Sequence, residues 1–364
     1  MNATLTSLQK PCALIMAGGT GGHIFPGLAV AKDLIAKGWR VHWLGAPASM
    51  EARVVPTHNI PLELVAFAGV RGKGIKTLLA APFKLIKAIA QAKRIMQSLR
   101  PDVVIGLGGF ITVPGAAAAR LCGVPIVLHE QNAIAGMANR YLSHMAKRVF
   151  TAFPDVLRKG EWVGNPMRSE FLMQQTAQQR YAQRTGPLKV LVLGGSLGAK
   201  ALNDAVPAAL ALMPQQQRPQ VVHQSGANHI DALRDTYFAA GVDGDLRAFI
   251  DDVATLMASA DVVICRAGAS TVTELTAVGA PALLVPFPHA VDDHQTANAQ
   301  FLVQAHAAWL VQQTELSPQW LANWLAGLTR AQLMQCGQNA SAVAQTKAVQ
   351  AIVQAVQLLQ EEGV

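Results

Sequence analysis

A glycine-rich run near the start of the chain, GGTGGH at residues 18–23, contains the residue types of a phosphate or sugar site. It follows an apolar segment at residues 12–17 and precedes a helical pattern at residues 26–37. Glycines allow positive φ and close approach to a ligand, and the N–H groups at a helix start favour anions. A tight strand-to-helix connection is the plainer interpretation. Four glycines and an imidazole exceed what a turn needs, so the run predicts a ligand site.

His23 closes this run and is the candidate general base, because an imidazole exchanges protons near neutral pH. A lone histidine at a turn is more often a hydrogen-bond partner of the helix end. Both interpretations stay open on the sequence alone.

A second candidate site is the stretch CRAGASTVTE at residues 265–274, which has the pattern of a strand end, a small-residue loop and a helix start. Small residues leave room for a diphosphate against backbone N–H groups, and the Glu274 carboxylate can accept hydrogen bonds from both ribose hydroxyls of a nucleotide. The alternative is a capping box, Thr271-x-x-Glu274, in which Glu274 only satisfies the helix N-terminus. The two interpretations are equally compatible with this stretch.

Two other kinds of site are tested and disfavoured. The stretch HAVDDHQTAN at residues 289–298 lacks the ligand spacing of a metal cluster and predicts polar contacts to a sugar instead. A dinucleotide fingerprint fails, since Ile24 occupies the position of its third glycine and residues 43–45 offer no acid for a ribose. We therefore expect neither a metal nor a cofactor.

The elements that position these residues alternate between apolar strands and helical patterns, which predicts an α/β fold with parallel sheets. The design restarts at residues 188–193, where an apolar strand precedes GGSLGA at residues 194–199 and a helix from Lys200. Further strands are expected at 40–44, 102–107, 125–129, 220–224, 246–250, 261–266 and 281–286, and a closing helix at 341–359. Gly, Asn and Pro at 164–166 form a plausible hinge between two domains.

Composition bounds the class of protein. The 364 residues are 51% hydrophobic and 14% charged, as in a folded enzyme with two cores. The cysteines, at 12, 122, 265 and 336, show no paired spacing, which favours reduced thiols. The first ten residues lack an apolar signal segment, so we expect a cytoplasmic protein.

The charge is unevenly distributed. Residues 1–165 carry 19 Lys and Arg against 7 Asp and Glu, whereas residues 166–364 carry 11 against 15. Residues 64–101 hold eight cations and no acid, which predicts an anionic partner. Nucleic acid fits poorly, because no aromatic stacking platform accompanies the cations.

A helix expected at residues 77–99 has one apolar stripe for its own core and a second apolar line beside the cations. Apolar side chains set among cations favour an anionic membrane surface, and the alternative is a solvated basic face. The membrane contacts expected are Ile75, Leu79 and Phe83 with Lys73, Lys76, Lys84 and Lys87.

Seven motifs in register over nearly the whole chain resemble the MurG family of N-acetylglucosaminyltransferases. The first is the glycine run extended to GGTGGHIFPGLA at residues 18–29. The others are HEQN at 129–132, GNPMR at 164–168, GGSLGA at 194–199, HQSG at 223–226, FIDD at 249–252 and the run 266–274. One departure is Leu197, where some members have glutamine, which puts a side-chain contact to phosphate there in doubt.

The resemblance implies a GT-B fold, two Rossmann-like domains with parallel sheets facing across a cleft. Residues 1–166 would bind the acceptor and the membrane, residues 167–344 the UDP-sugar donor, and a helix at 345–364 would pack back on the first domain. The donor contacts it implies are Thr20, Gly21, Gly22, Asn132, Arg168, Ser196, Ile250, Ala269, Ser270, Thr271, Val272, Thr273, Glu274 and Gln295.

The activity implied is inverting transfer of N-acetylglucosamine from UDP-GlcNAc to the C4 hydroxyl of undecaprenyl-pyrophosphoryl-MurNAc-pentapeptide, turning lipid I into lipid II. His23 would be its catalytic base or would orient the acceptor. The enzyme would serve peptidoglycan synthesis, cell shape and cell division as a peripheral protein of the cytoplasmic face of the inner membrane, beside cell-wall assembly proteins. Two alternatives remain: another UDP-sugar enzyme of this fold, such as a UDP-GlcNAc epimerase, or a noncatalytic module for nucleotide-sugars or anionic lipids.

Overall fold

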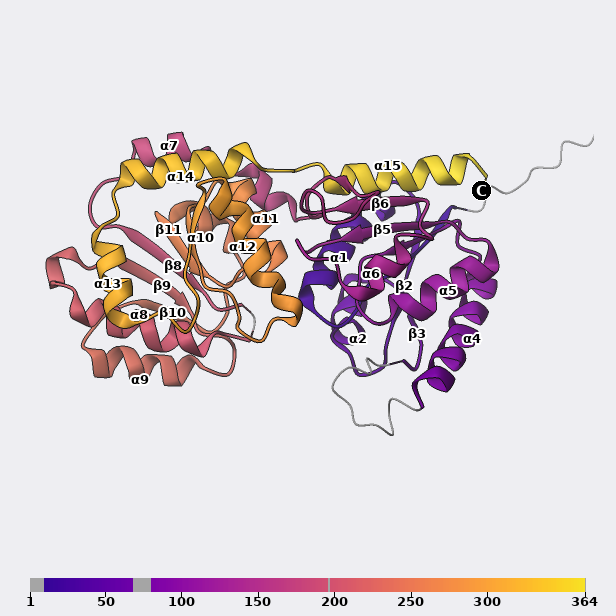
Figure 1. Cartoon of the computed structure of the whole chain (residues 1–364), viewed down its shortest axis with the longest axis horizontal. Helices are drawn as coiled ribbons and strands as arrows, with labels where there is room; N and C mark the ends of the chain where they lie inside the picture. Colours follow the sequence, from indigo (N-terminus) through magenta and orange to yellow (C-terminus); the bar gives the residue numbers. More distant parts are fainter. Residues whose placement is uncertain (1–9, 68–79, 196, 364) are drawn as a thin grey trace, which may run out of the picture. The chain divides into compact units, whose positions relative to one another are not determined.

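The computed structural model describes residues 10–67, 80–195 and 197–363. The chain divides into two compact units (Figure 1). Unit 1 comprises Met1–Gln131, Ala135–Met167 and Lys347–Val364, and unit 2 comprises Asn132–Ile134 and Arg168–Thr346.

Unit 1 is built on a fully parallel seven-stranded sheet with the order β3-β2-β1-β4-β5-β6-β7. Its strands are β1 (Cys12–Met16), β2 (Arg40–Gly45), β3 (Leu62–Leu64), β4 (Val103–Gly106), β5 (Ile126–Glu130), β6 (Arg148–Thr151) and β7 (Glu161–Trp162). Its helices are α1 (Gly21–Ala36), α2 (Met50–Val54), η1 (Val55–His58), α4 (Ala81–Leu99), α5 (Thr112–Cys122), α6 (Met137–Leu142) and α15 (Ala348–Glu361).

Successive residues of β1 face opposite layers, because side chains alternate along a strand. Ala13 and Ile15 pack in a cluster with α1 and α15, whereas Leu14 and Met16 pack with α4 and α5. Helices therefore cover both faces of the sheet, as Figure 1 shows for α15 beside α1 and β5. Burial on both faces explains why the central strands β1 and β4 are apolar throughout.

Unit 2 has a parallel six-stranded sheet with the order β10-β9-β8-β11-β12-β13. Its strands are β8 (Lys189–Leu193), β9 (Gln220–Gln224), β10 (Asp245–Arg247), β11 (Val262–Cys265), β12 (Ala282–Leu284) and β13 (Ala308–Leu310). Its helices are η2 (Ser169–Met173), α7 (Ala177–Ala182), α8 (Lys200–Leu212), η3 (Gln215–Gln217), α9 (Ile230–Ala240), α10 (Val253–Ser259), α11 (Ala269–Val278), η4 (Val291–Asp293), α12 (His294–Gln304), α13 (Pro318–Ala326) and α14 (Arg330–Ala342).

Counted from its own first strand, each sheet has the order 3-2-1-4-5-6 of a dinucleotide-binding Rossmann sheet, extended by one strand in unit 1. The prediction of an α/β fold with two Rossmann-like domains is confirmed.

Three predicted boundaries are wrong. Helix α1 begins at Gly21 rather than Pro26, because the glycine run itself forms the first turn and Pro26 lies inside the helix. The strand expected at 246–250 ends at Arg247. The closing helix expected from residue 341 is two helices, since α14 ends at Ala342 in unit 2 and α15 begins at Ala348 in unit 1.

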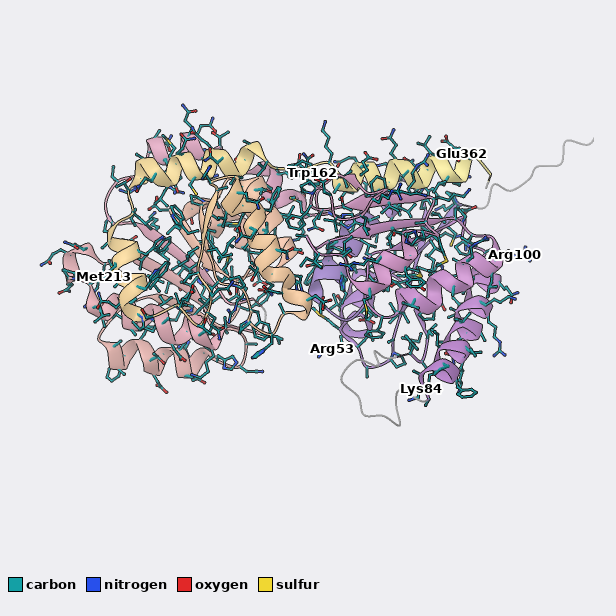
Figure 2. The ribbon with its side chains drawn as sticks, in the orientation of Figure 1. Arg53, Lys84, Arg100, Trp162, Met213 and Glu362 are labelled. Atoms are coloured by element: carbon teal, nitrogen blue, oxygen red, sulfur yellow. The ribbon has the colours of Figure 1, made fainter. Side chains whose placement is uncertain are left out.

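Helix α4 carries the predicted core stripe on one side, where Ala92 and Met96 are buried. Its other side exposes Phe83 by 76% and Ile86 by 65%. Lys84 and Lys87 are exposed on the same helix, and Figure 2 labels Lys84 near its start. No helix in the described parts of the chain is both long and apolar enough to span a bilayer.

Candidate active site

The glycine-rich loops lie where the strand order reverses in each sheet. In unit 1, loops follow β1 and its neighbour β4, and in unit 2, loops follow β8 and its neighbour β11. Ligands of open α/β sheets bind at this position, outside the carboxyl ends of the strands. Each unit therefore offers one candidate site.

In unit 1 the two loops pack backbone against backbone. The Gly18 N–H donates to the Gly108 carbonyl at 3.3 Å. A Cβ on Gly109 would lie 2.2 Å from the Gly18 oxygen, and Gly109 has a φ of 87°. Only glycine fits there, since this distance is far below contact and this φ disfavours side chains.

His23 lies against the same pair of loops. Its Nδ1 is 3.0 Å from the Gly18 carbonyl oxygen, which can only accept, so Nδ1 carries the proton and Nε2 the lone pair. A Cβ on Gly108 would lie 3.0 Å from Nε2. This bond fixes the ring on the turn, as expected if His23 is a hydrogen-bond partner of the helix end. It also makes Nε2 the basic nitrogen of the ring.

The start of α1 is arranged to accept a polar ligand. Thr20 is the N-cap residue, yet its side chain makes no capping bond, and no acid occupies the first turn. Among the described residues, the backbone N–H groups of Gly21 and Gly22 have no partner. The buried Gln131 Oε1 also has none, and it lies 3.4 Å from the position of a Gly108 Cβ. Unsatisfied donors at a helix start attract anions.

One further residue at this turn, Glu51, does not stand out in the sequence. Its side chain is fully buried, and its carboxylate accepts from the backbone N–H of Gly19 at 3.1 Å and of Ala46 at 3.2 Å. From the sequence it is indistinguishable from any acid in the first turn of a short helix.

In unit 2 the loop after β8 packs against the loop after β9 in the same manner. A Cβ on Gly198 would lie 2.0 Å from the Ser225 oxygen, and one on Gly226 would lie 2.4 Å from the Gly198 nitrogen. Helix α8 starts directly after this turn without a side-chain cap. Ser196, an expected donor contact, lies outside the described residues.

Glu274 does not cap α11, so the capping-box interpretation is wrong. The helix has Gly268 as its N-cap residue, which places Glu274 in the second turn. Glu274 makes no hydrogen bond within the described residues. Desolvation raises the pKa of its carboxyl to about 7, although the charge of Arg168 opposes this shift. A half-buried carboxyl with no hydrogen-bond partner is suited to a ligand.

The other residues expected on α11 divide into two groups. Within the described residues, the buried Ser270 hydroxyl has no hydrogen-bond partner, and it lies at the uncapped start of the helix. Val272 is fully buried, and the Thr273 hydroxyl donates to the Ala269 carbonyl at 2.9 Å. Ser270 and the backbone N–H groups of this turn can therefore bind a ligand, whereas the Val272 side chain belongs to the core.

Asn132 is held in unit 2 by Asn298, which ends the polar stretch 289–298 but is not one of the expected donor contacts. The fully buried Asn298 accepts from the Ala133 N–H at 2.8 Å and donates to Asn132 Oδ1 at 3.3 Å. It also donates to the Ala267 carbonyl at 3.1 Å. One amide therefore links Asn132 to the loop before α11, a pairing that chain positions 166 apart do not reveal.

Two of the remaining expected donor contacts belong to elements that pack against α11: Arg168 is the N-cap residue of η2, and Gln295 lies in α12. The exposed Arg168 guanidinium lies 5.1 Å from the centre of the Phe171 ring. Gln295 Oε1 accepts from the Phe287 N–H at 2.9 Å, and Ile250 is buried. Arg168 and Gln295 thus place a charge and an amide on elements beside one helix.

Two other histidines in the recognised motifs have structural roles. Burial lowers the pKa of His129 to about 4 and of His223 to about 3, so both are neutral at physiological pH. His129 Nε2 donates to the Gly164 carbonyl at 2.8 Å, and His223 bonds with Asn203 and Tyr237. Where the structure describes the chain, no three His, Cys, Asp or Glu side chains converge as metal ligands would.

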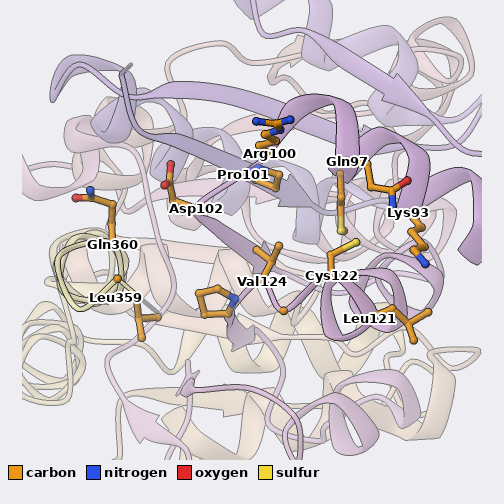
Figure 3. Close-up of a pocket in the computed structure, with 14 residues that line it drawn as sticks. Lys93, Gln97, Arg100, Pro101, Asp102, Leu121, Cys122, Val124, Leu359 and Gln360 are labelled. Carbon is orange, nitrogen blue, oxygen red and sulfur yellow. The ribbon is translucent and has the colours of Figure 1, made fainter. Parts of the chain in front are cut away.

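A hollow of about 770 Å³ lies at the opposite edge of the unit 1 sheet (Figure 3). Lys93, Arg100, Asp102, Cys122 and Gln360 are among its lining residues. Asp102 and Pro125 immediately precede β4 and β5, so this is the amino-terminal edge of the strands. None of the predicted site residues lines it.

Both halves of the chain match one family. Residues 13–151 match the glycosyltransferase family 28 N-terminal domain, and residues 189–356 match the glycosyltransferase family 28 C-terminal domain.

Curated relatives share a name. The chain is 57% identical over 347 residues to the UDP-N-acetylglucosamine–N-acetylmuramyl-(pentapeptide) pyrophosphoryl-undecaprenol N-acetylglucosamine transferase of Paracidovorax citrulli, covering 95% of this chain and 98% of the relative. It is 58% identical over 351 residues to the protein of that name from Verminephrobacter eiseniae, with the same coverage.

Solved structures agree on the fold. The crystal structure of Acinetobacter baumannii MurG superposes with a TM-score of 0.86 at 41% identity, covering 96% of this chain and 99% of that one. The calicheamicin glycosyltransferase CalG4 superposes with a TM-score of 0.66 at 14% identity, over 97% and 99% of the two chains, which supports the fold alone. The predicted GT-B class is confirmed.

We expect Glu274→Gln to stabilise the ligand-free protein at pH 8. Folding raises the carboxyl pKa from 4.5 to about 7, so the folded state binds more protons between these values and stability falls as pH rises. Removing the ionisable group should add about 1–3 kcal/mol to the free energy of unfolding at pH 8 and little at pH 4.5, as measured by urea denaturation. An equal effect at both pH values would contradict the raised pKa.

Proposed function

The chain belongs to glycosyltransferase family 28, and from this premise we propose that it transfers N-acetylglucosamine from UDP-GlcNAc to the C4 hydroxyl of MurNAc in undecaprenyl-pyrophosphoryl-MurNAc-pentapeptide. Lipid I becomes lipid II, an intermediate of peptidoglycan synthesis. The relatives that carry this activity in their name align over nearly the whole of both chains.

The single observation that carries the donor assignment is the state of Glu274. It is a half-buried carboxyl in the second turn of α11, with no capping role and no hydrogen bond within the described residues. Two ribose hydroxyls would supply the hydrogen bonds that its charged form needs. The uncapped start of α11 and the buried Ser270 hydroxyl would then bind the adjoining diphosphate.

We assign the acceptor to unit 1, with His23 as the base. Its Nε2 takes the proton of the C4 hydroxyl as the oxygen attacks the anomeric carbon of the donor sugar from the face opposite UDP. The bond to UDP breaks and its electron pair leaves on the phosphate oxygen. Backbone N–H groups at the helix starts and the Arg168 guanidinium stabilise that charge, and such donors contribute about 2.7–4 kcal/mol each in other enzymes.

We also propose that α4 attaches the enzyme to an anionic membrane surface, as a peripheral protein on the cytoplasmic face of the inner membrane. Phe83 and Ile86 are exposed on this helix beside Lys84 and Lys87. Ile86 joins the expected contacts because its side chain is also exposed, whereas Lys73, Ile75, Lys76 and Leu79 lie outside the described residues. Such attachment would bring the enzyme to its acceptor, which is a membrane lipid. Cell-wall assembly proteins remain proposed partners.

Incubation with labelled UDP-GlcNAc and a lipid I analogue tests the function, and the disaccharide lipid is the expected product. Glu274→Ala should weaken UDP-GlcNAc binding in calorimetry about 10–100-fold, because it removes a charged hydrogen-bond partner. The exposed Glu315→Ala in the same unit is the control and should bind normally. Donor binding without transfer would favour a noncatalytic module, and release of an epimerised UDP-sugar would favour an epimerase.

His23→Ala should lower kcat on the lipid I analogue about 100-fold or more, while UDP-GlcNAc affinity changes little. The loss follows because the proposed base acts only on the acceptor hydroxyl. His42→Ala is the matched control in unit 1, since His42 pairs with Glu63 away from the glycine turns. A His23→Ala enzyme with near-normal kcat would exclude His23 as the base.

Phe83→Ser/Ile86→Ser should weaken sedimentation with phosphatidylglycerol vesicles about 10–100-fold at low salt, because burial of each side chain contributes about 1.5–3 kcal/mol at most. Phe238→Ser is the control, because Phe238 is 90% exposed on α9 of unit 2. Unchanged vesicle binding by the double variant would exclude α4 as the attachment surface.

A further inference from the structure

We propose that Glu51 is a positioning residue that acts on His23 through the peptide bond between Gly18 and Gly19. The proposal rests on the role of His23 as the base in the function proposed above. It adds a buried carboxylate to the machinery of this site.

Glu51 is anchored beneath the glycine turn. It lies in the first turn of α2, which is capped by the Ser49 side chain. One carboxylate oxygen accepts from the Gly19 N–H and the other from the Ala46 N–H. Acceptance at both oxygens is the bonding pattern of an ionised carboxylate.

The Glu51 side chain packs closely against two glycines. A Cβ on Gly18 would lie 2.7 Å from Glu51 Oε1, and a Cβ on Gly45 would lie 2.8 Å from its Cγ. The glycines at 18 and 45 therefore make the space that this side chain fills. Its carboxylate is held against the turn by packing as well as by hydrogen bonds.

The Gly19 N–H and the Gly18 carbonyl belong to a single peptide unit. In a trans peptide these two groups point in opposite directions. Glu51 bonds to the N–H at 3.1 Å, and His23 Nδ1 bonds to the carbonyl oxygen at 3.0 Å. The peptide thus links a carboxylate to an imidazole, as a direct carboxylate–histidine bond does in other active sites.

This linkage favours the proton transfer proposed for His23. A carboxylate on the N–H polarises the peptide and places more negative charge on the carbonyl oxygen, because hydrogen bonds in a chain reinforce one another. When Nε2 takes the hydroxyl proton, the Nδ1–H bond to that oxygen becomes charge-assisted. Glu51 itself gains no proton. It keeps His23 Nδ1 protonated, fixes the orientation of the imidazole ring and stabilises the imidazolium.

Glu51→Gln tests the proposal, because the amide retains the size of the side chain but removes the charge. We expect kcat to fall roughly 10–100-fold, the effect of removing an outer partner from a metal-ligating histidine, with UDP-GlcNAc affinity unchanged. The acidic limb of the pH profile of kcat should move to lower pH, because the imidazolium loses a stabilising charge. A purely structural role would not move that limb, and an unmoved limb overturns the proposal.

Glu63→Gln is the matched control. It removes a carboxylate that also bonds a histidine of unit 1, His42 Nδ1 at 3.1 Å, but it has no link to the glycine turn. We expect its kcat and pH profile to match those of the unsubstituted protein. An equal shift in this variant would show that any lost acid in the unit has this effect, and would overturn the proposal.

A double-mutant cycle with His23→Ala separates this proposal from the proposed function. If Glu51 acts through His23, Glu51→Gln should cost almost nothing further in the His23→Ala background, whereas additive losses overturn the proposal. Should Glu51→Gln fail to fold, Glu51→Asp enters the same cycle, because it keeps the charge but shortens the side chain. A His23→Ala enzyme with full activity would instead overturn the assignment of the base. Absence of transfer by the unsubstituted enzyme would overturn the proposed function itself.

Discussion

The close approach of two backbone loops at the carboxyl edge of each sheet is the constraint on which the rest of the structure depends. In unit 1 the Gly18 carbonyl meets Gly109, and in unit 2 the Ser225 carbonyl meets Gly198, at distances that exclude any Cβ. Because the loops can pack this closely, the helices that follow them start at the sheet edge with uncapped N–H groups. The same fold element thus produces both a rigid turn and a site for anionic groups.

Burial then separates titratable residues that have structural roles from those that could bind a ligand. His129 and His223 lie fully in the interior, where desolvation keeps them neutral and each bonds within the fold. Desolvation instead raises the pKa of Glu274, a half-buried carboxyl that makes no hydrogen bond within the described residues. A charge of this kind destabilises the empty protein, and a ligand that supplied its hydrogen bonds would stabilise unit 2.

The sequence predicted the fold class well, because buried parallel strands and glycine turns leave strong local patterns. Helix boundaries were harder. Proline is common at the first position of a helix, so the sequence predicted a start at Pro26 and missed the first turn, which is made of glycines. No proline or glycine marks the break between Ala342 and Ala348, so the sequence predicted one helix there. Site residues within motifs, such as His23 and Glu274, could be selected from the sequence. Glu51 and Asn298 could not, because their importance comes from contacts with backbone groups far away in the chain.

Three acids of unit 1 bond to backbone N–H groups of strands and loops, so the unit can have both a basic surface and well-anchored loops. Glu51, Asp102 and Glu130 each accept a backbone N–H, from Gly19, Cys12 and Gly136 respectively. Their charge is thus used in bracing strand ends and loops, and two of the three are buried. Helix α4 itself contains no acid that could offset the charge of its cations. An anionic surface that approaches this helix meets positive charge, while the Glu51 carboxylate at the glycine turn is buried.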